Sequence, residues 1–167
     1  MAAKRKGEEP SNWTIRVLRT VAQYQFGPEF DQILVPEGVT VTFSPKTSRV
    51  REIIFQGKRI ATKRATDGMF SLGLFGAQRI IDRTPRPKRR VVILSEVGEF
   101  IAAGRNVFAK HVVAVDSEIK PEEEVVVVSE EDQLLAVGRA QLSAENMLAF
   151  ERGVAVKVRY GINKLKK

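Results

Sequence analysis

The sequence contains no cysteine and a single histidine, His111. Without thiols the chain can form no disulfide, no thiolate nucleophile, no iron–sulfur cluster and no cysteine-based zinc site. One histidine cannot build a multi-histidine metal site either. We therefore expect neither a metal nor another cofactor in this protein.

Long apolar runs are also missing. No stretch approaches the roughly 20 apolar residues that a membrane helix needs, and no apolar segment follows the charged start MAAKRKGEEPSN, so no signal peptide is visible. The 167 residues are 43% hydrophobic and 29% charged, a globular composition that allows one domain or two small ones. We expect a cytoplasmic protein with a disordered tail over residues 1–11.

Positive charge is present in excess, with a net charge of +8. Residues 1–90 hold 18 Lys and Arg against 8 Asp and Glu, a net of +10, whereas residues 91–167 hold 10 against 12, a net of −2. A basic chain without a membrane-binding helix points to a polyanionic partner, above all nucleic acid. Surplus lysine that serves solubility is the alternative, and charge alone leaves both open.

The first half of the chain has the pattern of a small α+β domain, over residues 12–82. Apolar residues at helical spacing predict a helix over 13–26, started by Ser11 or Asn12 and ended by Gly27-Pro28; these apolar residues are Trp13, Val17, Val21 and Tyr24. Because aromatic residues on such a stripe are usually core, we expect Trp13 and Tyr24 to be buried rather than stacked on bases. Alternating residues predict strands over 39–43, 51–55 and 59–64, with Gly57 in a hairpin turn.

The second half has a different pattern. Short strands recur at about ten-residue spacing with two small helices between them, which is typical of a compact barrel. We expect the strands over 90–97, 107–115, 125–128, 134–142 and 154–159, and the helices over 98–104 and 144–150. The four valines at 125–128 predict a strand buried on both faces. Between the halves, the basic segment 83–88 contains two prolines and reads as a stiff linker.

Few residues are candidates for catalysis. The acidic runs Glu122–Glu124 and 130–132 lie next to predicted strands, where solvated turns are the expected role. The segment 73–76, GLFG, lacks the third glycine of a dinucleotide fingerprint and a following Gly-Lys-Ser/Thr, so its spacing does not predict a phosphate loop. His111 is expected to be structural. This inventory favours a binding module over an enzyme.

The final predicted strand carries two cations. Its period of two places three valines on one face and Ala155, Lys157 and Arg159 on the other. Cations about 7 Å apart can follow adjacent phosphates of a nucleic acid, although an ordinary solvated barrel face explains them as well.

Three spaced segments of the second half resemble a PUA domain, an RNA-binding module of RNA-modifying enzymes. They are GRNVFAKHVVAVDSEIKPEEEVVVV, LLAVGRAQLS and MLAFERGVAVKVRYG, and the match covers nearly all of residues 89–161. In the first half, YQFG, KTSRVREI and ATDGMFSLGLFGAQRI resemble the region that precedes the PUA domain in archaeosine tRNA-guanine transglycosylase. The catalytic barrel and the cysteine-containing zinc site of that enzyme family are not among the 167 residues.

The resemblance implies an α+β fold class, with a small α+β pre-PUA-like domain (12–82), the linker (83–88), a PUA-type β pseudo-barrel with short helices (89–162) and a basic tail (163–167). It also implies an RNA-binding surface, made of Gly104, Arg105, Asn106, Val107, Phe108, Ala109, Lys110, Lys157 and Arg159. Phe108 fits a core position better than base stacking. We expect auxiliary RNA contacts from Arg83, Arg86 and Lys88. Two positions depart from the family: Ser48 stands where glycine is common, and Glu122-Glu123 where Gly-Asp is frequent.

From these observations we expect a non-catalytic RNA-binding protein. The resemblance implies tRNA as the RNA, bound at its acceptor stem and 3′ end, and a possible role in presenting tRNA to a separate RNA-modification enzyme. The alternative is a protein–protein adaptor subunit of a ribosomal or RNA-modification complex.

Overall fold

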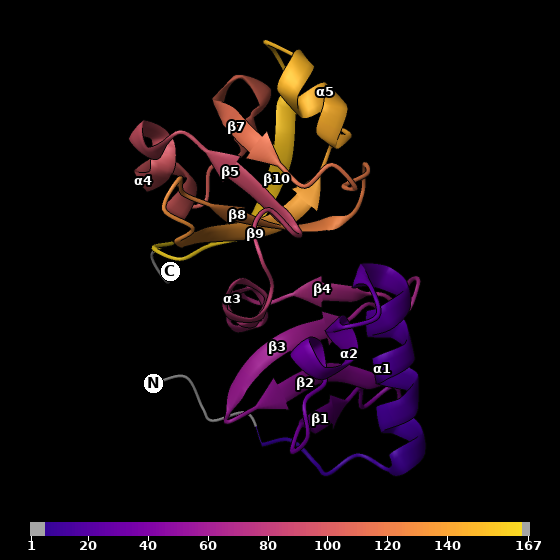
Figure 1. Ribbon diagram of the computed structural model, residues 1–167. Helices are drawn as coiled ribbons and strands as arrows, with labels where there is room; N and C mark the ends of the chain where they lie inside the picture. The colour runs from indigo at the N-terminus through magenta and orange to yellow at the C-terminus, as the bar shows by residue number, and fades with distance from the viewer. Residues whose placement is uncertain (1–5, 165–167) are drawn as a thin grey trace. The chain divides into compact units, whose positions relative to one another are not determined.

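The computed structural model describes residues 6–164 (Figure 1), so residues 1–5 and 165–167 of the two expected tails lie outside the described part. The chain divides into two compact units, Met1–Ile80 and Ile81–Lys167. The first contains one four-stranded sheet and the second one six-stranded sheet.

The sheet of the first unit is antiparallel, with its strands in sequence order. The strands are β1 (Thr40–Phe43), β2 (Val50–Phe55), β3 (Lys58–Lys63) and β4 (Phe70–Leu72). Gln56 and Gly57 join β2 to β3 with φ angles of 52° and 76°. Two successive positive φ values are those of a tight type I′ hairpin turn, so the expected hairpin is confirmed.

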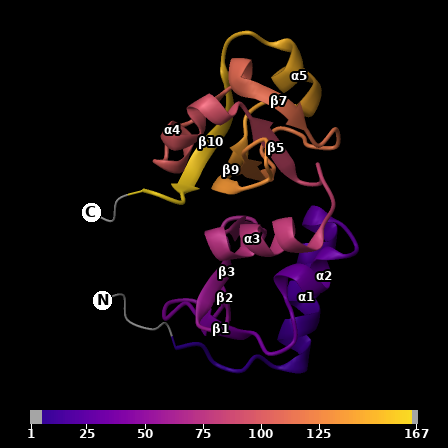
Figure 2. The ribbon, with the colours of Figure 1, turned by 60° about the vertical axis from the view of Figure 1, so that its left-hand side comes forward.

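Three helices belong to this part of the chain: α1 (Asn12–Phe26), α2 (Phe30–Leu34), which was not expected, and α3 (Leu74–Arg83), which runs across the division between the units. The Ser11 side chain caps α1 by accepting a hydrogen bond from the Thr14 N–H at 3.1 Å. α1 lies alongside the sheet (Figures 1 and 2), and the Gln25 side chain bonds both the N–H and the carbonyl of Phe70 in β4.

The prediction that Trp13 and Tyr24 are core residues is wrong. Their exposed fractions are 72% and 80%, and α1 instead buries the stripe Leu18, Ala22 and Phe26. Both stripes have helical spacing, so periodicity alone does not choose between them. The two hydrogen bonds of Gln25 to β4 lock the helix with the second stripe inward.

The GLFG segment packs α3 against β3. The Gly73 N–H donates to the Ile60 carbonyl at 2.9 Å, and a Cβ on Gly76 would lie 2.2 Å from that same oxygen. Only glycine permits so close an approach of a helix to a strand. The segment therefore has a packing role between α3 and β3.

The second unit is a nearly closed barrel, with strand order β6-β10-β9-β8-β5-β7. The strands are β5 (Arg90–Ile93), β6 (Val107–Phe108), β7 (Val112–Val115), β8 (Glu124–Val128), β9 (Leu134–Ala140) and β10 (Val154–Gly161). β5 and β8 are parallel and all other pairs are antiparallel. The short helices α4 (Gly98–Ala102) and α5 (Ala144–Ala149) lie outside the barrel (Figure 1).

Two short 3-10 helices interrupt strands that the sequence predicted as continuous. η1 (Ser95–Val97) follows β5, and η2 (Ala109–His111) separates β6 from β7. The single strand expected over 107–115 is therefore wrong, and His111 lies in η2 rather than in a strand. The expected burial of 125–128 is confirmed, because all four valines of β8 have no exposed surface.

Both departures from the family pattern adopt backbone angles that favour glycine. Ser48 has φ of 57° and Glu122 has φ of 73°, values that cost a residue with a side chain more than they cost glycine. The turns are kept in spite of the substitutions.

Part of each expected tail is ordered. Glu8 forms two backbone hydrogen bonds with Val41, at 2.7 and 2.8 Å, and Pro10 is buried. The prediction of disorder is therefore wrong for this part of residues 6–11. At the other end, the Asn163 N–H donates to the Ala102 carbonyl at 2.8 Å.

Candidate nucleic-acid interface

Residues 83–90 form a basic stretch whose last residue, Arg90, begins β5. Carboxylates and carbonyls of the same unit hold most of its arginines. Arg90 has no exposed surface, and its guanidinium bonds both carboxylate oxygens of Asp132, at 2.7 and 3.2 Å. It also donates to the Thr84 hydroxyl and to the Ile81 carbonyl. Arg90 is therefore part of the fold and out of reach of any ligand.

Arg89 is held in the same way. Its side chain donates to the Glu123 carboxylate at 3.0 Å and to the Glu124 carbonyl at 2.6 Å, while its N–H donates to Asp116 at 2.7 Å. Only 6% of the side chain is exposed.

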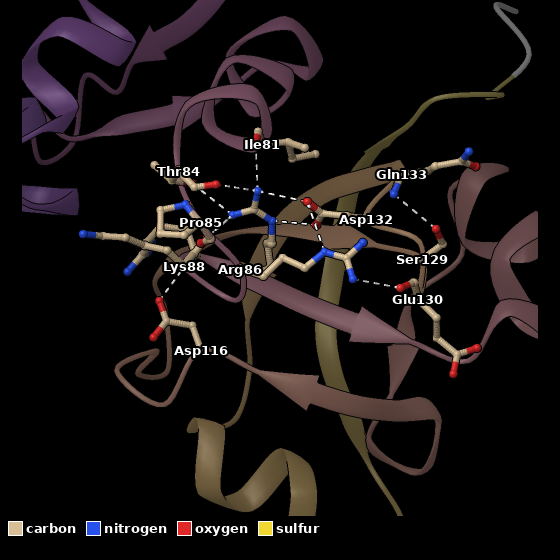
Figure 3. Close-up of polar contacts among 12 residues, drawn as sticks. Ile81, Thr84, Pro85, Arg86, Lys88, Asp116, Ser129, Glu130, Asp132 and Gln133 are labelled. Carbon is tan, nitrogen blue, oxygen red and sulfur yellow. Dashed lines mark hydrogen bonds and ion pairs between the residues drawn. The ribbon is translucent and has the colours of Figure 1, made fainter.

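The three residues expected to make auxiliary contacts differ in their surroundings. Arg86 reaches Asp132 at 3.4 Å and the Glu130 carbonyl at 3.1 Å, with half of its side chain exposed (Figure 3). Lys88 is half-buried, and its carbonyl accepts from Arg90. Arg83 is exposed at the end of α3. Of the three, Arg83 is the most open to an RNA phosphate.

The acidic run 122–124 is the predicted solvated turn only at Glu122, whose side chain is 72% exposed and reaches Arg139 at 3.3 Å. Glu123 holds Arg89, and Glu124 is 1% exposed and binds Arg159 through both carboxylate oxygens. The prediction is wrong for Glu123 and Glu124, because these carboxylates meet arginines that are distant in sequence.

The second acidic run also has structural roles. Asp132 holds Arg90 and Arg86, while Glu130 accepts hydrogen bonds from the Ser95 hydroxyl at 2.8 Å and the Ser95 N–H at 3.1 Å. The Ser95 hydroxyl and N–H together lower the pKa of Glu130 below its ordinary value.

A different group of cations is exposed along β6 and β10. Arg105, Lys110 and Lys157 are exposed, and none of them forms an ion pair within residues 6–164. Arg159 differs from these three, because Glu124 binds its guanidinium, which also lies 5.5 Å from the centre of the Tyr160 ring. This bond gives Arg159 a structural role between β10 and β8.

The other expected site residues lie in or next to β6 and have structural roles. The Asn106 side chain accepts a hydrogen bond from the Val158 N–H at 3.0 Å, which fastens the segment before β6 to β10. Val107 and Ala109 are buried, so their side chains cannot reach a ligand. Gly104 has φ of 104°, a value that side chains rarely allow.

Phe108 is the aromatic residue of β6. It is 46% exposed, so the prediction of a core position is wrong. It pairs with Val154 of β10, meets the His111 ring edge-on at 6.4 Å and lines a cavity of about 260 Å³. The other lining residues are Lys110, Glu151, Arg152 and Gly153.

Arg152 is an exposed cation that the sequence reasoning missed. Its position in the segment MLAFERGVAVKVRYG, directly before Gly153 and β10, was the available signal. We define the β6–β10 edge as Arg105, Phe108, Lys110, Arg152 and Lys157. It combines an exposed aromatic ring with four cations, which is the composition of a surface that takes a single-stranded base and the neighbouring phosphates.

Among residues 6–164 no three metal-binding side chains are grouped together. The same part of the chain contains no helix with the length and apolar character needed to cross a membrane.

Two family models match the chain. Residues 16–87 match the patch-forming domain C2 of tRNA-guanine transglycosylase, and residues 89–162 match the PUA domain.

Similar curated proteins are archaeal enzymes named tRNA-guanine(15) transglycosylase. The one from Thermococcus kodakarensis is 41% identical over 158 residues, which cover 94% of this chain and 27% of that protein. The one from Pyrococcus abyssi is 42% identical over 149 residues, covering 89% and 25%. The chain thus spans about a quarter of the length of the curated relatives it matches.

Solved structures share the fold at low identity. A hypothetical protein from Pyrococcus horikoshii aligns with a TM-score of 0.76 and 23% identity, over 95% of this chain and 96% of its own. A PUA domain from Aeropyrum pernix aligns with a TM-score of 0.71 and 15% identity, over 95% and 87%. The chain therefore joins a patch-forming domain C2 to a PUA domain, and it resembles the C-terminal region of archaeal tRNA-guanine(15) transglycosylase.

Proposed function

We propose that the protein is a non-catalytic RNA-binding protein and that the β6–β10 edge is its contact surface. The observation that carries this proposal is the exposure of Phe108 in a cavity flanked by Lys110 and Arg152. Burying an aromatic ring stabilises a fold, so an exposed ring needs another explanation. Stacking with a base supplies about 1–3 kcal/mol, and the cations on either side suit phosphates.

The proposed ligand is tRNA, bound at its acceptor stem and 3′ end. The PUA domain and the 41% identity to an enzyme named for its tRNA substrate support this assignment. A protein recognises an A-form stem by its shape, through contacts to phosphates and 2′-hydroxyls, whereas a single-stranded end offers bases that can stack. Arg83, Arg86 and Lys88 make auxiliary phosphate contacts in this proposal, and the protein presents the tRNA to a separately encoded modification enzyme in the cytoplasm.

The salt dependence of tRNA affinity tests the proposal. The four cations of the edge alone contribute a fall in log K of between about 3 and 4 per log unit of salt concentration, at roughly 0.7 to 0.9 per phosphate, and auxiliary contacts steepen it further. Arg152→Gln should lower that slope by nearly one, and Phe108→Ala should weaken binding with little change of slope, because a ring carries no charge.

Arg16→Gln is the matched control, since Arg16 is an exposed arginine of α1 that belongs neither to the β6–β10 edge nor to the auxiliary contacts. Its tRNA affinity should stay that of the wild type. A flat salt dependence, or equal affinities for Arg152→Gln and Arg16→Gln, would contradict the proposed surface.

The second candidate is a protein–protein adaptor, which the exposed side chains Leu148 (57%) and Phe150 (45%) favour. An apolar docking face that joins Phe108 to Ile101 would be its strongest support, but Ile101 is only 3% exposed. An adaptor predicts that Leu148→Ser breaks a complex in cell extract while tRNA affinity stays unchanged.

A further inference from the structure

The first unit has a cavity of about 540 Å³ at one end of its sheet. We call it the Arg64 pocket. Its walls are the loop after β1, the first residues of β2, the last residues of β3 and the loop that leads to β4. The lining residues are Ser44, Thr47, Arg49, Val50, Arg51, Thr62, Lys63, Arg64, Ala65, Thr66, Asp67 and Gly68.

The pocket has a strong excess of positive charge. Four of its lining residues are cations, Arg49, Arg51, Lys63 and Arg64, and one is a carboxylate, Asp67. The carboxylate is engaged, because it binds Nε of Arg64 at 3.0 Å, Nη2 of Arg64 at 2.9 Å and the Met69 N–H at 2.9 Å. Arg49, Arg51 and Lys63 form no ion pair within residues 6–164.

Arg64 has one nitrogen without a hydrogen-bond partner. Asp67 fixes one edge of the guanidinium, but Nη1 is buried and donates to no protein acceptor. A buried donor that carries charge and lacks an acceptor is costly, so such an atom indicates an acceptor that is supplied from outside. An anion in the pocket would supply it.

The two loops that form the pocket are closed by their own hydrogen bonds. The Ser44 N–H donates to Arg49 and the Ser48 N–H to Ser44, both at 2.8 Å, and the Arg64 N–H donates to Met69 at 2.8 Å. A frame that is held in this way loses little conformational entropy when a ligand binds.

The lining selects the chemistry of the ligand. Hydroxyls accompany the cations, from Ser44, Thr47, Thr62 and Thr66, and no lining residue is aromatic. Hydroxyls and guanidinium groups suit phosphate oxygens, whereas the lining has no aromatic ring on which a base could stack. This composition favours a phosphate group over a nucleoside.

We propose that the Arg64 pocket binds a phosphate group of RNA, as a second RNA contact that lies in the first unit. The proposal rests on the proposed function, since the bound molecule is the same. Two sources share this chemistry, the 5′-terminal phosphate and the internal phosphodiesters of the backbone. The lining would read no base, so this contact adds affinity without sequence preference.

The test measures tRNA affinity for Lys63→Gln and Arg51→Gln in the full chain. These two side chains have no bonded carboxylate, so their replacement leaves the Arg64–Asp67 pair in place. Each variant should bind about three- to tenfold more weakly at low salt, and its salt slope should fall by nearly one. Lys58→Gln is the matched control, because Lys58 is a lysine at the opposite end of the same strand and outside the pocket.

Each RNA is tested with a 5′-phosphate and with a 5′-hydroxyl. A loss confined to the phosphorylated RNA assigns the pocket to the terminal phosphate, and an equal loss with both assigns it to the backbone. If Lys63→Gln and Arg51→Gln bind both RNAs with the same affinity as Lys58→Gln, the pocket proposal is overturned. If Arg152→Gln still weakens binding in that case, the proposed function stands without the pocket. Failure of the wild type to bind RNA would overturn both.

Discussion

Two groups of basic residues in the second unit have opposite surroundings. Arg89 and Arg90, at the end of the basic stretch, are buried and bound by Glu123 and Asp132. Arg105, Lys110, Arg152 and Lys157, on the β6–β10 edge, are exposed and form no ion pair within the described residues. The difference shows that the density of positive charge in the sequence does not predict which cations are exposed and unpaired. The placement of the acidic residues decides which cations remain available.

The buried group has a physical cost that explains its many partners. A guanidinium removed from water is stable only when carboxylates and carbonyls replace its hydration. Arg90 meets this requirement with a carboxylate, a hydroxyl and several carbonyls. An exposed cation keeps its water and needs no partner, so a phosphate can take that place.

Arg90→Ala should have the largest effect on stability. It leaves a cavity, removes the partner of Asp132 and leaves carbonyls such as that of Ile81 without a donor. Breaking a buried ion pair costs about 3–5 kcal/mol, and we expect the free energy of unfolding to fall by that amount. Urea denaturation followed by circular dichroism measures it.

Arg105→Ala is the control on the exposed side. Its free energy of unfolding should stay within about 0.5 kcal/mol of the wild type, as for most surface substitutions, while its tRNA affinity falls. Equal stability losses in the two variants would remove the distinction between the two groups.

Glu124→Gln should have the next largest effect. The carboxylate is 1% exposed and holds Arg159, and the amide keeps the shape but loses the charge. We expect a loss of about 2–3 kcal/mol in the free energy of unfolding, because Arg159 then stands partly buried without its counter-charge. Glu122→Gln in the same run should cost less than about 1 kcal/mol, since the Glu122–Arg139 pair is exposed. Similar losses in both would show that burial does not matter here.

The sequence predicts the fold correctly where a local pattern is compatible with only one local structure. The hairpin around Gly57, the cap at Ser11 and the buried valines of β8 were all predictable. Each depends on neighbours within a few residues. The choice between the two apolar stripes of α1 was not predictable, because the hydrogen bonds of Gln25 to Phe70 join residues that are 45 positions apart.

The candidate site followed from the sequence only in part. The resemblance to PUA domains pointed to one edge of the barrel, and Arg105, Lys110 and Lys157 are exposed there. It did not reveal that Arg159 is held by Glu124, which lies 35 positions away. The Arg64 pocket was not found, because the residues that form it come from two loops that only the β2–β3 pairing brings together.

The basic stretch itself offers a smaller test of the comparison. Arg86 lies between the two groups, since it is half-exposed and yet touches Asp132 and the Glu130 carbonyl. The double variant Arg86→Gln/Lys88→Gln should weaken tRNA binding by only about two- to threefold, as expected for auxiliary contacts, and unfold like the wild type within about 1 kcal/mol. A loss as large as that of Arg152→Gln would place the main contact on the stretch instead of the edge.

The smallest expected effect is that of Glu130→Gln on the pH dependence of stability. Hydrogen bonds from Ser95 hold its pKa below the ordinary 4.5 in the folded state. A group with a lowered folded pKa contributes stability above its unfolded pKa, and that contribution is lost as the pH falls through the folded pKa. Removing the carboxylate with Glu130→Gln should therefore make stability less sensitive to acid below about pH 4.5. Urea midpoints between about pH 3 and pH 6 measure this dependence.

Glu131→Gln is the control from the same acidic run, because Glu131 meets the Ser95 hydroxyl only at 3.5 Å, the limit of a hydrogen bond. Its acid sensitivity should stay closer to that of the wild type than that of Glu130→Gln. If Glu131→Gln changed the pH dependence as much as Glu130→Gln, the number of carboxylates in the run, rather than the contact each one makes, would govern the acid response.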